Sequence, residues 1–427
     1  MYAIVDCNSF YCSCERLFMP ALWKKPVAVL SNNDGCIISR TDEAKGLGLD
    51  MGAPYFQFRQ LIEENGITIF SSNYHLYGDM SQRVMDTLRS VAGREQVEVY
   101  SVDEAFVNLK EVPTKQLSTF LRELKDRTEA WTGIQVSVGA GPTKVLSKVA
   151  NRLAKKNKQA TNCIVVLQTE EAICNALQRT PVGDIWGIGR RYACLLKESF
   201  GIENAWQLCQ MHEAWARKNL GGVVGVRLLK ELKGFSCIDL KEPLEHKKMI
   251  ATTRMFGKPV YELSALQEAI STYASRAAEK LRRQFCTARQ MDVFIMHRST
   301  EYSPGVYRPE SKHLHGRLPM ATCDTQQLIR HARELVAQLY QPGLKYIKAG
   351  IILSELFPDN AVQGNLFAPF AEEHRRVLMH VLDNINFSMR DDAVRYAATG
   401  TKRNWKMRQE KRSKRYTTCW DELFEIG

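Results

Sequence analysis

The chain lacks the features that would place it in a membrane or in an oxidising compartment. None of its apolar runs reaches the length of about 18 residues that a membrane-spanning helix needs. Its 12 cysteines include no C-x-x-C pair and no Cys/His spacing typical of zinc sites. The sequence opens on the strand-like run Tyr2–Val5, where a secreted protein would carry a signal peptide. We therefore expect reduced thiols and a cytoplasmic protein without a membrane span.

Acidic residues are missing from one long stretch and are rare in another. No Asp or Glu occurs from Ala130 through Thr169. The basic run from Lys402 through Arg415 contains one acidic residue, Glu410. The formal net charge is +12 over 427 residues. A basic run is usually a solvated face or a tail, but two separate runs favour contact with phosphates. Nucleic acid is therefore the leading candidate partner.

The length predicts roughly two to four domains. Strands and helices alternate up to Leu167, which indicates an α/β or α+β core, although the segment Met51–Ser72 reads as irregular. Short helices with glycine loops follow, and then a charged linker containing Pro243. The pattern from Lys248 to Leu356 predicts the order β-α-β-β-α-β, and the remaining tail is weakly patterned and basic.

Three carboxylates follow apolar strands. Asp6 ends the first strand, and Asp103 and Glu104 end a middle strand. Neighbouring strands would bring these acids together, where they repel one another unless cations neutralise them. Oxygen ligands suit Mg²⁺, and two such ions about 3.5–4 Å apart can catalyse phosphoryl transfer. Any one of these acids alone would more simply be a loop-end residue or a helix cap, but the combination favours a metal site.

Two motifs carry a resemblance to a known family. The runs Asp6–Glu15, DCNSFYCSCE, and Ser101–Phe106, SVDEAF, resemble the two active-site motifs of Y-family DNA polymerases. Leu30–Cys36 and Trp186–Arg191 resemble the UmuC-type subgroup, the catalytic subunit of bacterial DNA polymerase V. The motifs occur in the expected order, so the resemblance covers nearly the whole chain. It implies an α+β multidomain fold, the right-hand polymerase with palm, fingers, helical thumb and little finger.

The resemblance also implies domain boundaries. They are 1–11 and 76–168 for the palm, 12–75 for the fingers, 169–236 for a thumb with a helix-hairpin-helix, 237–247 for a linker, 248–357 for the β-α-β-β-α-β little finger, and 358–427 for a clamp-binding peptide and partner-binding tail.

The resemblance assigns the catalytic centre. Asp6, Asp103 and Glu104 match the family's catalytic metal ligands, and the main-chain carbonyl of Cys7 matches a fourth ligand position for two Mg²⁺ ions. Tyr11 matches the steric gate, whose ring lies where a ribose 2′-hydroxyl would be. Phe10 matches the aromatic residue under the incoming sugar, although plain core packing would also explain it.

Three side chains match positions that contact the triphosphate of the incoming dNTP, namely Ser39, Lys45 and Lys155. A hydroxyl and two cations suit the charge that builds on the leaving pyrophosphate, although Lys155 could instead face solvent. Asp42 stands where many family members have a tyrosine. An ionised acid there repels phosphate, so we expect one contact fewer or an Asp42 turned to solvent.

The run Ile185–Arg190 resembles a helix-hairpin-helix, with Gly187, Gly189 and Arg190 placed to contact DNA. Glycines let the backbone approach a phosphate closely, and such contacts read no sequence. An ordinary glycine turn between two helices is the alternative.

A short peptide near the C-terminus resembles the motif that docks on the bacterial sliding clamp, with Gln363, Leu366 and Phe367 as its anchors. Gly364 departs from the usual leucine, and the peptide could instead pack on its own domain. The resemblance further implies primer-template DNA, a UmuD′-type dimer and a RecA filament as partners.

The sequence therefore predicts an error-prone translesion DNA polymerase without proofreading that acts in the SOS DNA-damage response. A nucleotidyl cyclase with a two-metal palm would have no use for the hairpin glycines, the little finger or the clamp-like peptide. A non-catalytic DNA-binding scaffold that recruits other polymerases would not need to hold three repelling acids together.

Overall fold

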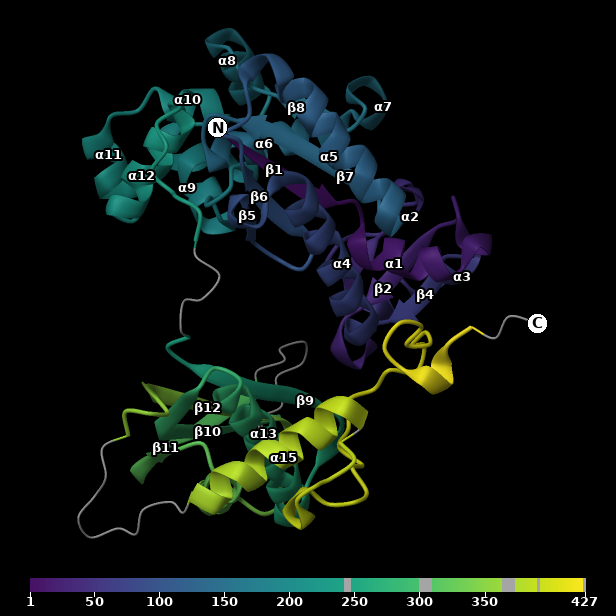
Figure 1. The fold of residues 1–427 in the computed structure, drawn as a ribbon, viewed down its shortest axis with the longest axis vertical. Coiled ribbons are helices and arrows are strands. Elements are labelled where there is room, and N and C mark those ends of the chain that lie inside the picture. Colours follow the sequence, from purple (N-terminus) through teal and green to yellow (C-terminus); the bar gives the residue numbers. More distant parts are fainter. Residues whose placement is uncertain (242–246, 299–308, 363–372, 390–391, 425–427) are drawn as a thin grey trace. The chain divides into compact units, whose positions relative to one another are not determined.

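The computed structural model describes residues 1–241, 247–298, 309–362, 373–389 and 392–424 (Figure 1). The chain forms two compact units. Unit 1 comprises Met1–Val29, Ile37–Leu244 and Arg412–Gly427, and unit 2 comprises Leu30–Cys36 and Glu245–Lys411. Of the helices in the described ranges, none has both the length and the apolar character to span a bilayer. The finer domain boundaries that the resemblance implies stay predictions.

The centre of unit 1 is a five-stranded sheet with the order β5-β6-β1-β7-β8. Strand β1 runs antiparallel to both of its neighbours. The odd-numbered residues Ala3, Val5 and Cys7 belong to the core beneath helices α4 and α5, and side chains alternate along a strand, so Asp6 faces α6. The elements are β1 (Tyr2–Cys7), β5 (Val97–Val99), β6 (Glu104–Asn108), β7 (Val136–Gly141), β8 (Ile164–Val166), α4 (Tyr74–Ala92), α5 (Leu117–Thr132) and α6 (Lys144–Lys156).

Helix α6 lies unusually close to the sheet because one residue of β7 has no side chain. A Cβ atom on Gly139 would lie 2.0 Å from the backbone nitrogen of Asn151. The helix begins after Thr143, whose hydroxyl accepts a hydrogen bond from the backbone N–H of Leu146. The close approach brings the side chains of α6 within reach of the acids on β1 and β6.

A second sheet of unit 1, with the order β3-β2-β4, lies next to α1, and a set of short helices follows the central sheet. The expectation that Met51–Ser72 is irregular is wrong, because it contains α3 and β4. These two elements have only 6 and 4 residues, which is too short for a clear hydrophobic period. The elements are α1 (Phe10–Phe18), β2 (Val27–Leu30), β3 (Ile37–Arg40), α2 (Asp42–Gly46), α3 (Arg59–Glu64), β4 (Thr68–Ser71), α7 (Lys158–Thr161), α8 (Glu170–Gln178), α9 (Arg190–Phe200), α10 (Ala205–Cys209), α11 (Glu213–Asn219) and α12 (Val223–Leu232).

Unit 2 contains a four-stranded sheet with the order β11-β10-β12-β9, packed against α13 and α14. The predicted order β-α-β-β-α-β is confirmed. Its elements are β9 (Ile250–Val260), α13 (Leu263–Arg282), β10 (Cys286–Arg298), β11 (Pro309–Thr322), α14 (Thr325–Leu339) and β12 (Tyr346–Pro358).

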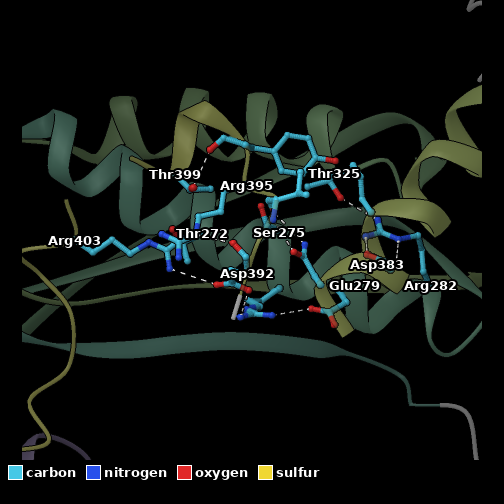
Figure 2. A pocket seen from close by; sticks show the side chains of 15 residues that line it. Thr272, Ser275, Glu279, Arg282, Thr325, Asp383, Asp392, Arg395, Thr399 and Arg403 are labelled. Carbon is cyan, nitrogen blue, oxygen red and sulfur yellow. Dashed lines mark hydrogen bonds and ion pairs between the residues drawn. The ribbon is translucent and has the colours of Figure 1, made fainter. Parts of the chain in front are cut away.

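The weakly patterned tail contains a helix that the sequence reading missed, α15 (Glu373–Met389). Figure 2 shows Arg282 of α13 beside Asp383 of α15. The guanidinium and the carboxylate form two hydrogen bonds of 2.6 and 2.7 Å, and the arginine side chain is almost fully buried. This paired geometry fixes α15 on unit 2. The chain then returns to unit 1 at Arg412, and we call Arg412–Phe424 the terminal segment.

Candidate active site

Two of the predicted metal ligands face each other across neighbouring strands. Asp6 on β1 is the direct cross-strand partner of Glu104 on β6. The prediction that their strands are neighbours is confirmed. Burial raises the pKa of Asp6 to about 7, the cation of Lys155 opposes this rise, and a hydrogen bond with Glu104 adds to it. Asp6 is therefore a carboxyl group that holds a proton much more readily than an exposed aspartate.

Glu104 carries the negative charge of the pair. Burial alone would raise its pKa, but the hydrogen bond from Asp6 and the ion pair with Lys148 together lower it. The Lys148 ammonium donates to both Glu104 oxygens, at 2.9 and 3.0 Å. Two carboxylates this close repel each other, and here a proton neutralises Asp6 while the Lys148 cation balances Glu104.

Asp103 lies beside this pair but turns its carboxylate elsewhere. The Ser101 hydroxyl donates to the Asp103 carboxylate at 2.5 Å, and the Asp103 carbonyl accepts from the backbone N–H of Cys7 at 2.8 Å. Within the described ranges, no three His, Cys, Asp or Glu side chains converge closely enough to hold a metal ion. The structure therefore brings Asp6 and Glu104 together and anchors the Asp103 main chain next to them.

The two lysines of this site come from one face of α6. Lys155 lies 2.5 Å from Asp6, and Lys148 pairs with Glu104. The Lys148 Nζ atom also lies 4.5 to 5.8 Å from the ring centroids of Tyr100, Phe106 and Trp186, so cation–π attraction stabilises its charge. A third lysine, Lys144, is buried one turn earlier against Glu98. Sequence reasoning places Lys148 and Lys144 in the acid-free basic stretch but not in this site, although spacings of four and seven residues place all three lysines on one helical face.

The donor set suits a hard divalent cation. Asp6 and Glu104 supply carboxylate oxygens in a partly buried site, and the proton and the lysines show that the site demands positive charge. Mg²⁺ is commonly held by one or two carboxylates together with substrate phosphates. A bound cation would take over the neutralising role of the Asp6 proton, so these residues fit the metal that the resemblance implies.

The predicted steric gate is part of an aromatic cluster. Tyr11 stacks on Tyr77 with ring centroids 4.5 Å apart and an interplanar angle of 18°, and Tyr74 meets it edge-on at 6.1 Å. Phe10 is buried in the core of unit 1, 5.7 Å from the Tyr11 ring. Tyr11 itself is half-buried, and Tyr77 supports one face of its ring. Tyr77 was missed by sequence reasoning, because it lies 66 residues away in the chain, the difference between positions 77 and 11.

The three predicted triphosphate contacts are differently placed. Ser39 is buried, and its hydroxyl accepts from the backbone N–H of Cys12 at 3.4 Å. Lys45 is exposed on α2, and Lys155 is held by Asp6. Asp42, which stands where many family members have a tyrosine, is exposed, and its carboxylate forms an ion pair with Lys158. Its charge is thereby partly neutralised.

The glycine turn before α9 contains a backbone conformation that favours glycine. Gly187 has a φ of 98°, which only glycine adopts without strain, and Gly189 caps the N-terminus of α9. Arg190, the first residue of α9, is exposed. The preceding Trp186 donates to the Tyr100 hydroxyl at 3.0 Å and fixes this turn to the central sheet. The predicted clamp anchors Gln363, Leu366 and Phe367 lie outside the described residues.

Family models and curated relatives match almost the entire chain. The model described as the impB/mucB/samB family matches residues 5–152, its C-terminal domain matches 247–366, and a domain of unknown function, DUF4113, matches 376–426. Protein ImpB of Salmonella typhimurium is 39% identical over 99% of each chain. Protein UmuC of Salmonella typhimurium strain LT2 is 37% identical over 100% of each, and DNA polymerase IV of Corynebacterium diphtheriae is 28% identical over 62% of this chain and 57% of that protein.

Solved structures agree on the fold. A Y-family DNA polymerase chimera of Dbh and Dpo4 covers 84% of this chain and 99% of its own, with a TM-score of 0.67 at 20% identity. An insertion ternary complex of Dbh DNA polymerase covers 83% and 98%, with a TM-score of 0.54 at 21% identity. The predicted right-hand polymerase fold is thereby confirmed. With full-length relatives at 37 to 39% identity, the chain belongs to the impB/mucB/samB family and has the fold of the Y-family DNA polymerases.

Proposed function

We propose that this chain is an error-prone translesion DNA polymerase that acts in the SOS DNA-damage response. The observation that carries the proposal is the pairing of Asp6 with Glu104 across the central strands, beside Asp103 and under the lysines of α6. Full-length similarity to UmuC and ImpB supports it, and partial similarity to DNA polymerase IV supports the nucleotidyl-transfer chemistry. The reaction is a divalent-metal-dependent, DNA-directed addition of deoxynucleotides.

The carboxylates form the catalytic centre. Asp6, Asp103 and Glu104 would hold two Mg²⁺ ions, with the Cys7 carbonyl as a further ligand. When bound, the cations activate the attacking oxygen and stabilise the leaving oxygen of an in-line displacement. The residues themselves supply a charged, partly dehydrated site, and binding of the cations would require Asp6 to be ionised and the Asp103 carboxylate to be released from Ser101. Lys148 pairs with Glu104 and balances the charge of that carboxylate.

The incoming dNTP is held by its sugar and its phosphates. Tyr11 excludes a ribose 2′-hydroxyl by occupying its volume, and Phe10 supports the sugar from the core. Ser39, Lys45 and Lys155 bind the triphosphate and offset the charge of the leaving pyrophosphate. The ion pair of Asp42 with Lys158 keeps that acid away from the phosphates.

The remaining contacts are to DNA and to other proteins. Gly187, Gly189 and Arg190 bind a backbone phosphate of the primer-template at the N-terminus of α9. Gln363, Leu366 and Phe367 dock on the sliding clamp, which raises the local concentration of the polymerase at the primer end. A UmuD′-type dimer and a RecA filament complete the active complex.

Primer extension past an abasic site tests the proposal. The reaction contains Mg²⁺, dNTPs, a UmuD′-type partner and RecA with ATP, and compares the wild type with the double variant Asp103→Ala/Glu104→Ala. The matched control is Glu63→Ala/Glu64→Ala, which removes another adjacent acidic pair, on the exposed end of α3. We expect extension by the wild type and the control, and a loss of roughly 10³-fold or more in the active-site variant, as typical for removing transition-state charge stabilisation.

Two outcomes contradict the proposal. Equal extension by all three proteins means that the assigned carboxylates are not the catalytic ones. Absence of extension by the wild type, with DNA binding intact and partners present, points to a DNA-binding scaffold.

A further inference from the structure

The terminal segment reaches the aromatic support of the proposed steric gate through a buried carboxylate. Tyr77, which stacks on Tyr11, is 1% exposed and donates its hydroxyl proton to Glu15 Oε1 at 2.6 Å. Glu15 is 0% exposed. The Ser413 hydroxyl of the terminal segment donates to the same oxygen at 3.0 Å. One carboxylate oxygen therefore joins the C-terminal chain to the ring behind Tyr11.

Glu15 depends on these two donors. Its second oxygen, Oε2, is buried and has no hydrogen-bond partner within the part of the chain that the structure describes. A buried carboxyl group with too few donors is costly, so loss of either donor weakens the hold on the other. The position of the Tyr77 hydroxyl is consequently coupled to the presence of Ser413.

The terminal segment is anchored at the start of the helix that carries Tyr77. Asn73 caps the N-terminus of α4, and its amide donates to the Ser413 carbonyl at 3.3 Å, the Ser413 hydroxyl at 3.0 Å and the Lys414 carbonyl at 3.1 Å. Arg412 forms a parallel β-bridge with Ser71 at the end of β4. These contacts place Ser413 by backbone geometry as well as by its side chain.

Aromatic stacking completes the docking. Tyr416 stacks on Phe18 of α1, at 4.8 Å, and on Phe424, at 4.7 Å, with interplanar angles of 9° in both pairs, and Phe18 and Phe424 lie 6.3 Å apart. Within the segment, Arg415 pairs with Glu422 at 2.7 and 2.9 Å and holds its two ends together. The terminal segment is thus docked by several contacts on α1 and α4, the helices that carry Tyr11 and Tyr77.

We propose that the terminal segment is a positioning element for sugar selection, acting on Tyr11 through Ser413, Glu15 and Tyr77. The inference rests on the proposed role of Tyr11 as the steric gate. It gives a function to the second half of the region that matches a domain of unknown function. Ser413, Glu15 and Tyr77 are buried behind Tyr11, so we expect their substitution to leave dNTP incorporation in place and to loosen the discrimination against ribonucleotides.

The test is the ratio of kcat/KM for dCTP to kcat/KM for CTP, measured with the full chain, the partners and undamaged primer-template. The variants are Ser413→Ala, Tyr77→Phe and the double variant. The control is Lys414→Ala, whose side chain is exposed next to Ser413. We expect Ser413→Ala and Tyr77→Phe each to lower the ratio by roughly three- to tenfold, the range of one typical intramolecular hydrogen bond. Values for dCTP alone should stay within about twofold.

Three further variants test whether Ser413 acts on Tyr11 through Glu15 and Tyr77. The double variant should lose little more than either single variant, because both donors act on one oxygen. Ser413→Thr, which keeps the hydroxyl, should restore the ratio. Tyr416→Ala, which removes the stacking on Phe18, should lower the ratio as Ser413→Ala does while the unfolding midpoint of unit 2 stays unchanged.

The outcomes separate this inference from the proposed function. An unchanged ratio in Ser413→Ala and Tyr416→Ala, with a ratio that collapses in Tyr11→Ala, overturns the positioning role and leaves the polymerase standing. Equal losses for dCTP and CTP overturn it as well, because they indicate a merely structural role. Absence of dCTP incorporation by the wild type overturns the polymerase assignment and the positioning role with it.

Discussion

The buried ion pair at the start of α6 offers a quantitative test of how the lysines of the active site are placed. The Lys144 and Glu98 side chains are 1% and 8% exposed and form an ion pair. Lys144 also donates to the Asp239 carbonyl at 2.9 Å, and Glu98 accepts from the backbone N–H of Lys241 at 3.0 Å. The ammonium group lies 4.7 Å above the ring of Phe106. Removing either partner leaves a charge in an apolar site.

The perturbation is a double-mutant cycle with Glu98→Gln, Lys144→Met and both. Each single variant should lower the free energy of unfolding by about 3–5 kcal/mol, because it leaves an uncompensated buried charge. The double variant leaves no buried charge. It loses only the backbone contacts of Asp239 and Lys241, which are partly exposed and can bind water, so we expect a cost of about 1–2 kcal/mol. The coupling free energy should therefore exceed about 3 kcal/mol.

The assay is urea unfolding in which hydrogen exchange of the β6 amides is the readout, because these amides report on unit 1 without interference from unit 2. A shift of the midpoint at constant slope measures the change in stability. Additive effects, or a single-variant loss below about 1 kcal/mol, would refute the reasoning, since water would then reach the pair and screen it.

Three other predictions concern stability. Burial raises the pKa of Glu15 from 4.5 to about 7, so the folded state binds the proton more tightly than the unfolded state does. The free energy of unfolding should therefore fall by up to about 1.4 kcal/mol per pH unit as pH rises from about 4.5 to about 7. In urea titrations at several pH values, Glu15→Gln should remove this slope. Gly139→Ala should cost about 3 kcal/mol or more in thermal unfolding, because its Cβ meets backbone atoms of α6, whereas Gly46→Ala meets nothing within 4 Å and should be near neutral. Arg282→Met should destabilise unit 2 by about 3–5 kcal/mol, and adding Asp383→Leu should recover most of this loss; a lasting deficit would contradict a charge effect.

The sequence allowed the frame of the site to be predicted because local signals carry it. Acids next to apolar strands predict that the carboxyl groups meet, and Asp6 and Glu104 do lie opposite each other on β1 and β6. The expectation that Glu104 ends a strand is wrong, because β5 already stops at Val99 and Glu104 is the first residue of β6. The β-α-β-β-α-β order of unit 2 follows from clear changes of period between strands and helices. In each case the signal lies within a few residues of the structure that it predicts.

What could not be predicted depends on contacts between distant residues. The stacking of Tyr11 on Tyr77 and the link from Ser413 to Glu15 join parts of the chain that share no local pattern. Most of the large apolar side chains of α15 are exposed, and the helix is fixed by the ion pair of Arg282 with Asp383, which no local pattern in the sequence indicates. The turn of the Asp103 carboxylate toward Ser101 likewise depends on one hydrogen bond.

The return of the chain to unit 1 at Arg412 makes the docking of the terminal segment an intramolecular event. A short tether gives its end a local concentration on the order of 1 mM at its own binding face. A free molecule present at about 1 µM must therefore bind that face roughly a thousandfold more tightly than the terminal segment does, a difference of about 4 kcal/mol, to displace half of it. The terminal segment therefore keeps the face formed by Phe18 and Asn73 occupied against any weaker competitor at that concentration.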